Sequence, residues 1–261
     1  MPGAPRVLFV THNVPRFAGD AAGSFVLRLA TALQARGARV HVVAPGAPGL
    51  APTDVIEGVS IDRVRYASDA RMTLAYTGTM AEAVAGSWSG RFALLQLLWA
   101  TRRHVRRVLE AARRAGDPFQ VVHVHWWFPS GLALLKSWHR TDPPRVVTMH
   151  GSDVRLAEKK TFAHGLMRAV LGDAAVRTAV STWLADLARR IAPAGDILVA
   201  PMPVDVRHFV GLSTAAHRTG VLFVGRLNQQ KGLADLLAAL ARPELSALTL
   251  RVVGDGPDKG T

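Results

Sequence analysis

The chain has 261 residues, of which 49% are apolar and 20% charged, so a packed core can form. It has no cysteine, which excludes disulfides, thiolate catalysis and Cys-ligated zinc. The net charge of +13 indicates an anionic partner, and nucleic acid, an anionic membrane surface and phosphorylated substrates all satisfy that requirement. No apolar run reaches the ~20 residues that span a bilayer, and the N-terminus lacks a signal-peptide pattern, so we expect a cytoplasmic protein.

The N-terminal pattern predicts a strand over 7–10, a helix from about Ser24 to Arg36 and a strand over 39–44. Ser24 is the expected N-cap of the helix, and Gly37 is placed for its C-terminal cap. A strand, helix and strand in this order indicate a parallel sheet with helices on its faces. Residues 59–66 alternate weakly and are expected to add a strand.

A long helix is predicted over 91–114. Its expected buried face carries Leu94, Leu98, Val105, Leu109 and Ala112. The opposite face carries Arg103, Arg107 and Arg114, and the neighbours Arg102, Arg106 and Arg113 are expected to broaden this basic side.

This basic helix allows three interpretations. The first is an ordinary surface helix with a solvated charged face. The second is contact with an anionic membrane, because Trp88, Phe92 and Trp99 accompany the arginines. Nucleic acid is the least favoured, because no nucleic-acid-binding motif accompanies the charge.

Two histidine-bearing strands follow. His123 and His125 project to one face of a strand over 121–125, but no third ligand lies nearby in the sequence to complete a metal site. A strand over 146–149 ends at His150, Gly151, Ser152 and Asp153. A histidine at the carboxyl end of a buried strand is well placed to enter a ligand cleft. Asp153 has the alternative of capping the following helix.

The C-terminal stretch predicts a strand over 221–224, a loop and a helix over 233–240. The loop contains Gly225, Arg226, Lys231 and Gly232. Its two cations and the helix N-terminus favour a phosphate, and more specifically a diphosphate, as ligand. The alternative is a Rossmann-like loop whose Arg and Lys are merely solvated.

Four strings in the chain resemble motifs of the retaining glycosyltransferases of family 4. GRLNQQKG is similar to G-R-L-x-x-x-K-G, TMHGSD to H-G-S-D, VVHVHWWFPSG to H-x-H-W-x-x-P-S-G, and GDAAGSFVLRLATALQARG to the glycine-containing first loop and helix. The resemblance implies an α/β fold of GT-B type, with two Rossmann-like domains across a cleft. It assigns residues 1–210 to the N-terminal acceptor-side domain, 211–219 to a linker and 220–261 to an incomplete sugar-nucleotide-binding domain.

The resemblance also implies roles for individual residues. Arg226 and Lys231 would bind the diphosphate of a sugar nucleotide, and His150 would contact the donor sugar as the catalytic residue. Gly19 would let the first loop approach the donor phosphates or the acceptor, although a turn alone also explains a glycine there. Further residues expected to line the cleft are His125, Gly151, Asp153 and Gly225.

Two features depart from the family pattern. Pro201, Met202 and Pro203 replace its P-N-G, although Asp205 matches. The pair of glutamates that holds the donor in the family's second domain is absent.

The leading hypothesis is a retaining glycosyltransferase with a nucleoside diphosphate sugar as donor. No cofactor or essential metal is expected, because two cations already face the diphosphate. The acceptor would be lipid-linked or a glycan, in the synthesis of cell-surface polysaccharide or glycolipid, with the protein peripheral at the inner face of the cell membrane. The alternatives are a catalytically incompetent fragment that binds an acceptor or a membrane, and a sugar nucleotide epimerase.

Overall fold

The computed structural model describes residues 3–76, 84, 87–137, 139–209 and 219–260. The chain forms two compact units, Met1–Val204 and Asp205–Thr261. The division into domains with a linker over 211–219 stays a prediction, because residues 210–218 lie outside the described part of the chain.

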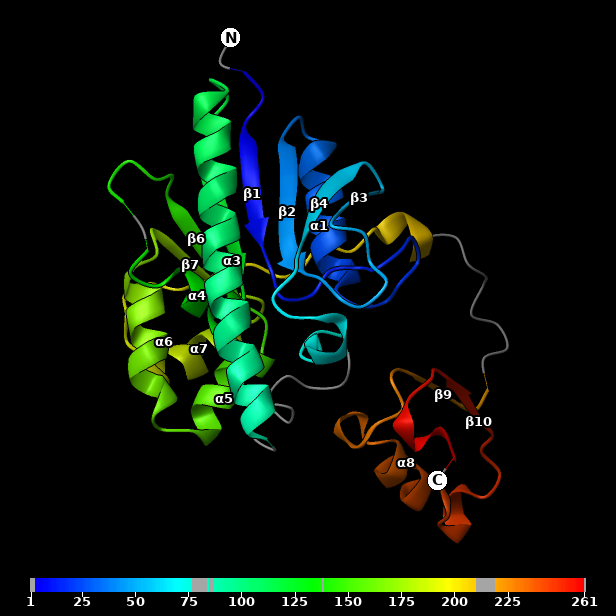
Figure 1. Cartoon of the computed structure of the whole chain (residues 1–261). Coiled ribbons are helices and arrows are strands. Elements are labelled where there is room, and N and C mark those ends of the chain that lie inside the picture. Colours follow the sequence, from blue (N-terminus) through cyan, green and yellow to red (C-terminus); the bar gives the residue numbers. More distant parts are fainter. Residues whose placement is uncertain (1–2, 77–83, 85–86, 138, 210–218, 261) are drawn as a thin grey trace. The chain divides into compact units, whose positions relative to one another are not determined.

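The first unit is built on an eight-stranded sheet in the order β3-β4-β2-β1-β5-β6-β7-β8 (Figure 1). All neighbours are parallel except β3 and β4, which pair antiparallel. The strands are β1 (Arg6–Val10), β2 (Arg39–Pro45), β3 (Thr53–Ile56), β4 (Val59–Val64), β5 (Val121–His125), β6 (Arg145–Met149), β7 (Val176–Ala179) and β8 (Leu198–Val199). The predicted parallel α/β sheet is confirmed.

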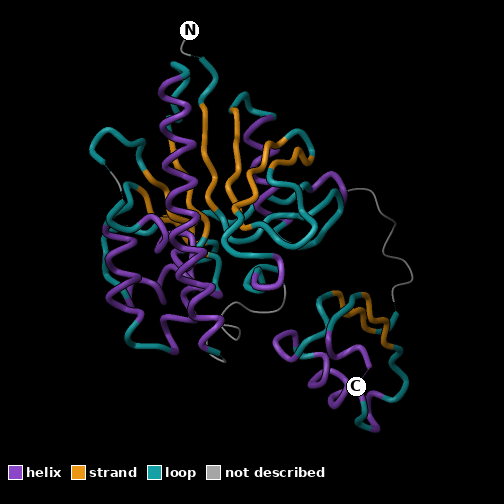
Figure 2. Tube along the Cα trace, in the orientation of Figure 1, coloured by secondary structure: helices purple, strands orange, loops and turns teal. Residues whose placement is uncertain are grey.

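Helices flank this sheet (Figure 2). They are α1 (Ser24–Gln34), α3 (Trp88–Arg114), α4 (Leu132–Leu134), α5 (Ser152–Lys159), α6 (Ala163–Gly172) and α7 (Thr182–Ile191). Alternate residues of each strand face opposite sides, so β1 contributes to two cores. Leu8 packs in the core that holds α3, α5, α6 and α7, whereas Phe9 packs in the core under α1.

The ends of α1 differ in part from the prediction. Ser24 is already helical, and the N-cap position belongs to Gly23, whose φ of 63° is left-handed and which leaves no side chain to cap the helix. The C-terminal end follows the prediction, since Gly37 has φ 88° and donates to the carbonyl of Gln34. Ala38 donates to the carbonyl of Leu33, which completes a Schellman motif.

The long helix α3 starts earlier than predicted, at Trp88, because the Ser87 hydroxyl accepts from the N–H of Gly90 at 3.0 Å. Its buried stripe is Gly90, Ala93, Leu97, Thr101, Val105, Leu109 and Ala112, so Leu94 and Leu98 lie at the margin of the core.

Three arginines expected on the basic side of α3 turn toward the protein instead. Arg102 donates to the carbonyls of Ala133 and Leu135. Arg106 and Arg113 both pair with Asp142, whose side chain is fully buried. Tertiary contacts therefore narrow the free basic face of α3.

The second unit contains two parallel strands, β9 (Val221–Val224) and β10 (Leu250–Val253), and the helix α8 (Leu233–Leu240). The strand, loop and helix predicted here are confirmed. Among the described hydrophobic side chains of this unit only Leu227 is buried, and Leu222, Val224 and Val253 are more than half exposed.

Candidate functional site

Three strand ends bring the first group of candidate residues together. Strands β1, β5 and β6 are neighbours and parallel, so their carboxyl ends lie at one edge of the sheet. His12 follows β1, His125 ends β5 and His150 follows β6. The fold thus gathers three imidazoles from segments far apart in the sequence.

The rings of this histidine cluster are in contact. His125 stacks on His123 with centroids 4.2 Å apart and on His150 at 5.2 Å. The ring of Trp126 contacts the rings of His12 and His150, with centroids 4.2 Å and 4.3 Å apart. The predicted common face of His123 and His125 is confirmed.

A hydrogen bond joins the two histidines that the sequence singled out. Nδ1 of His125 lies 3.0 Å from Nε2 of His150. Nε2 of His125 is buried without a partner among the described residues. Because a buried N–H without an acceptor is costly, the proton of His125 is favoured on Nδ1, from which it donates to His150. The neutral His150 ring then carries its own proton on Nδ1.

Burial keeps these rings neutral. It lowers the pKa of His12 and of His123 to about 4 and the pKa of His150 to about 3. The pKa of His125 is lowered well below its ordinary value by burial and by the neighbouring imidazoles. At neutral pH the cluster therefore offers neutral donors and acceptors and no cation.

His125 does not line an open cleft as predicted. Its side chain is fully buried, because Phe9 contacts it edge-on at 4.8 Å and His150 and His123 stack on it. His150 is only partly buried, and its Nδ1 forms no hydrogen bond with a described residue. His125 therefore positions the His150 ring from the protein interior, through the hydrogen bond and the ring stacking.

Asp153 is likewise buried, with 2% of its surface exposed. Its carboxylate accepts from the backbone N–H groups of Trp127, His150 and Gly151 at 3.0, 3.2 and 3.1 Å. Burial raises its pKa to about 6 against the lowering effect of these bonds. Asp153 therefore links the ends of β5 and β6, and its side chain is not exposed to a cleft. Gly151 occupies the N-cap position of α5 with φ 117°.

The loop between β1 and α1 has two glycines with different surroundings. Gly19 is exposed with φ 87°, and no atom lies within 4 Å of the position that its Cβ would take. At Gly23 an added Cβ would lie 2.5 Å from the Asn13 carbonyl oxygen. Gly23, and not Gly19, is therefore the glycine at which another backbone segment of the protein, that of Asn13, comes close. The role of Gly19 toward a ligand stays a prediction.

An ion pair that the sequence analysis missed holds this loop. The Asp20 carboxylate accepts from Nε of Arg16 at 2.7 Å and from its backbone N–H at 3.0 Å. The hydrogen bond from the Arg16 side chain lowers the pKa of Asp20 to about 2. The four-residue spacing was the available signal, but nothing in the sequence showed that the carboxylate would be nearly buried.

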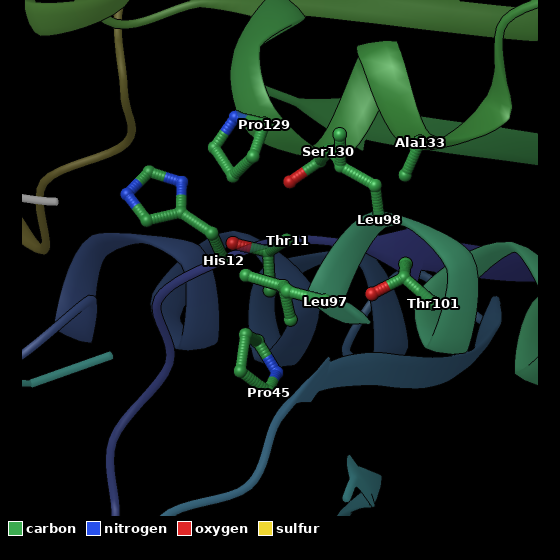
Figure 3. Close-up of a pocket in the computed structure, with 9 residues that line it drawn as sticks. All are labelled: Thr11, His12, Pro45, Leu97, Leu98, Thr101, Pro129, Ser130 and Ala133. Carbon is green, nitrogen blue, oxygen red and sulfur yellow. The ribbon is translucent and has the colours of Figure 1, made fainter. Parts of the chain in front are cut away.

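A small cavity of about 10 Å³ lies beside His12, which is roughly the room of one water molecule. Residues from the ends of β1 and β2, from α3 and from the segment after β5 surround it (Figure 3). Its lining residues are Thr11, His12, Pro45, Leu97, Leu98, Thr101, Pro129, Ser130 and Ala133.

The cationic loop forms a separate candidate site in the second unit. Arg226 and Lys231 are exposed, and neither forms an ion pair with a described residue. The Cγ of Lys231 lies 4.0 Å from where a Cβ of Gly225 would be, so the lysine stem passes along the Gly225 backbone. Gly232 then takes the N-cap position of α8 with φ 70°. Lys231 thus directly precedes the start of α8, whose first turn contains Asp235.

A pair of glycines after β10 shapes this loop, and the sequence analysis gave them no role. An added Cβ would lie 1.8 Å from the Gly225 oxygen at Gly254 and 2.1 Å from the Leu227 oxygen at Gly256. The N–H of Leu227 donates to the carbonyl of Asp255 at 3.0 Å. The loop after β9 can therefore run against the loop after β10 only because both positions are glycine.

Within the described residues no three His, Asp or Glu side chains are grouped as a metal ion would require. The same part of the chain contains no helix that is long and apolar enough to cross a membrane.

Comparison with known proteins decides the family. The model of Glycosyltransferase Family 4 matches residues 22–208, which run from the start of α1 past β8 and include both histidine strands, β5 and β6. The chain belongs to glycosyltransferase family 4. TuaC of Bacillus subtilis, which is named as a teichuronic acid biosynthesis glycosyltransferase, is 30% identical over 182 residues. That match covers 64% of this chain and 46% of TuaC, so the chain spans about half of that relative.

Solved structures agree on the fold. The catalytic domain of starch synthase IV from Arabidopsis thaliana, bound to ADP and acarbose, matches with a TM-score of 0.61 at 14% identity. The UDP-forming trehalose-phosphate synthase of Burkholderia vietnamiensis matches with 0.60 at 13% identity. Each match covers 98% of this chain, and the chain covers 69% and 65% of the two structures. The α/β fold of GT-B type is confirmed.

Proposed function

We propose that the protein is a retaining glycosyltransferase that moves a sugar from a nucleoside diphosphate sugar to an acceptor. The observation that carries this proposal is the cationic loop after β9. Arg226 and Lys231 are both exposed there, and neither is neutralised by a described carboxylate. A guanidinium, an ammonium and a helix N-terminus together suit the adjacent phosphates of a diphosphate.

The same cations have a role in the reaction. When the bond between the sugar and the diphosphate breaks, negative charge grows on the leaving diphosphate. Fixed positive groups stabilise that charge in the transition state. For this reason we propose that catalysis needs no divalent metal, and full activity in the presence of a chelator is the expected result.

In the first unit, we assign to His150 the role of binding the transferred sugar. Its ring is neutral, it is held from behind by His125, and its Nδ1 proton has no acceptor among the described residues. The ring can therefore donate a hydrogen bond to a sugar oxygen. The low pKa argues against a role as a charged acid at neutral pH.

The relatives support the choice of substrates only by analogy. Starch synthase IV was solved with ADP, and the trehalose-phosphate synthase is UDP-forming. TuaC is named for teichuronic acid biosynthesis. We accordingly propose a lipid-linked or glycan acceptor and a place at the inner face of the cell membrane. Nucleic acid is not proposed as a partner.

The test is a transfer assay with UDP-glucose and ADP-glucose as probe donors. We expect release of the nucleoside diphosphate together with a glycoside that keeps the anomeric configuration of the donor. Arg226→Ala combined with Lys231→Ala should lower the rate by about 100-fold or more, because two groups that face the leaving charge are lost. Arg242→Ala removes an exposed charge elsewhere in the same unit and should leave the rate unchanged. An inverted product, or equal rates for all three proteins, would contradict the proposal.

The alternative is a catalytically incompetent protein that binds an acceptor. In that case UDP-glucose and ADP-glucose would both remain intact while a glycan acceptor still bound to the first unit.

A further inference from the structure

Large apolar side chains are exposed along one side of α3 near its N-terminus. This is the cyan-green end of the helix in Figure 1. These side chains are Trp88, Phe92, Leu95 and Trp99, with exposed fractions of 83%, 56%, 63% and 61%. Steps of four, three and four residues place them on one side of the helix. We call this set the indole stripe.

Arginines accompany the indole stripe. The guanidinium of Arg91 lies 4.8 Å from the ring centre of Trp88, and that of Arg103 lies 5.2 Å from Trp99. Arg107 continues the exposed side one turn further. None of the three forms an ion pair with a described carboxylate, and the only acidic residue of α3 is Glu110. The indole stripe is thus apolar, and the charged side chains that accompany it are arginines.

The fold of the first unit does not require this stripe. The core contacts of α3 come from the opposite side, through residues such as Leu97, Val105 and Leu109. The inward-turned arginines Arg106 and Arg113 are already bound to Asp142. A cluster of exposed indole, phenyl and leucyl groups of this size is unusual on a soluble surface and marks an interaction site.

We propose that the indole stripe docks on an anionic lipid bilayer, with α3 lying along its surface. Trp and Phe favour the boundary between headgroups and acyl chains, and Leu95 adds apolar area at the centre of the stripe. Arg91, Arg103 and Arg107 would face the phosphates of anionic headgroups. Nucleic acid fits less well as the partner, because Leu95 at the centre of the stripe makes no polar contact with a phosphate backbone. This docking holds whether or not the protein transfers a sugar.

Flotation of the chain with vesicles tests the proposal. Binding should occur with phosphatidylcholine vesicles that contain phosphatidylserine, should be much weaker with phosphatidylcholine alone, and should fall as salt is raised above physiological ionic strength. Arg91→Gln combined with Arg103→Gln should weaken binding by about fivefold for each arginine. Arg28→Gln with Arg36→Gln removes two exposed charges from outside α3 and is the matched control.

The apolar part has its own pair of variants. Trp88→Ser with Trp99→Ser should reduce partitioning by at least about tenfold, because two large side chains no longer enter the interface. Trp183→Ser is the control, because Trp183 is 51% exposed and also has an arginine, Arg155, 5.1 Å from its ring centre, but lies on α7.

A spectroscopic readout separates direct contact from a change in folding. Trp88→Phe with Trp99→Phe should still bind the vesicles but lose most of the fluorescence quenching caused by brominated lipid. Binding that is equal for neutral and anionic vesicles, or that falls equally in stripe and control variants, would overturn the proposal. Binding of the indole stripe to an acidic protein but to no vesicle would also overturn the proposal.

Discussion

Nδ1 of His125 lies 3.0 Å from Nε2 of His150, and this contact fixes which nitrogen of His150 carries the proton. We expect ¹⁵N chemical shifts to show His150 as a neutral ring protonated at Nδ1 at neutral pH. His125→Phe removes the donor while keeping a ring against Phe9, so His150 should shift toward the Nε2-protonated form. His123→Phe changes the neighbouring ring, which does not bond His150, and should leave the tautomer as it is. A wild-type His150 protonated at Nε2 would refute the assignment.

The buried histidines predict a loss of stability in mild acid. The folded pKa values of His12, His123 and His150 are about 4, 4 and 3, below the ordinary value of 6.5, and that of His125 is also lowered. The unfolded chain therefore binds more protons below about pH 6.5, and each such proton lowers the free energy of unfolding by about 1.4 kcal/mol per pH unit. Asp153 acts in the opposite direction between its ordinary 3.8 and about 6, because its folded pKa is raised.

Urea unfolding between pH 7 and pH 4.5 measures this balance. With four histidines against one aspartate, the free energy of unfolding should fall steadily as the pH drops. His123→Gln keeps a partner for Thr148 but cannot titrate, so its slope should be shallower by about one proton. Stability that rises from pH 6.5 to pH 4.5 would show that the histidines are not buried in this way.

Asp142 is expected to contribute strongly to stability. Its buried carboxylate holds Arg106 and Arg113, so it ties α3 to the segment before β6. Asp142→Ala leaves two partly buried arginines without their partner and should cost about 3–5 kcal/mol of unfolding free energy. The exposed Glu110→Ala on the same helix should change it by less than about 0.5 kcal/mol. A loss below about 1 kcal/mol in Asp142→Ala would mean that the pair is solvated.

Gly23 and Gly19 form a matched pair of variants. Gly19→Ala meets no neighbour and should cost about 1–2 kcal/mol for a left-handed backbone alone. Gly23→Ala adds a Cβ 2.5 Å from a backbone oxygen of Asn13, so it should cost clearly more. Thermal unfolding of the two variants checks the order. The reverse order would place the close backbone approach at Gly19.

The sequence predicts most of the first unit because its signals are local. The apolar runs of β1, β5 and β6 and the helical spacing of α1 each specify an element without reference to the rest of the chain. The parallel arrangement follows from their alternation. The position of His150 at the end of a strand could be predicted for the same reason, since a strand end is visible in the sequence.

What could not be predicted depends on contacts between distant segments. Whether His125 lines a cleft or is buried depends on Phe9 and His150, which come from other parts of the chain. The inward turn of Arg106 depends on Asp142, and periodicity carries no information about such a partner. The N-cap of α1 was misplaced because Gly23 is required by its contact with Asn13, which outweighs the capping preference of Ser24.

The most direct test of the proposed donor site is calorimetric titration of the chain with UDP and with ADP. We predict that at least one of them binds with a Kd below about 1 mM. Arg226→Ala with Lys231→Ala should weaken that binding by about 100-fold or more, because two charge-assisted contacts of about 1.5–3 kcal/mol each are lost. Arg242→Ala should bind as the wild type does. Equal affinity in the double variant and the wild type would contradict the assignment of the diphosphate to Arg226 and Lys231.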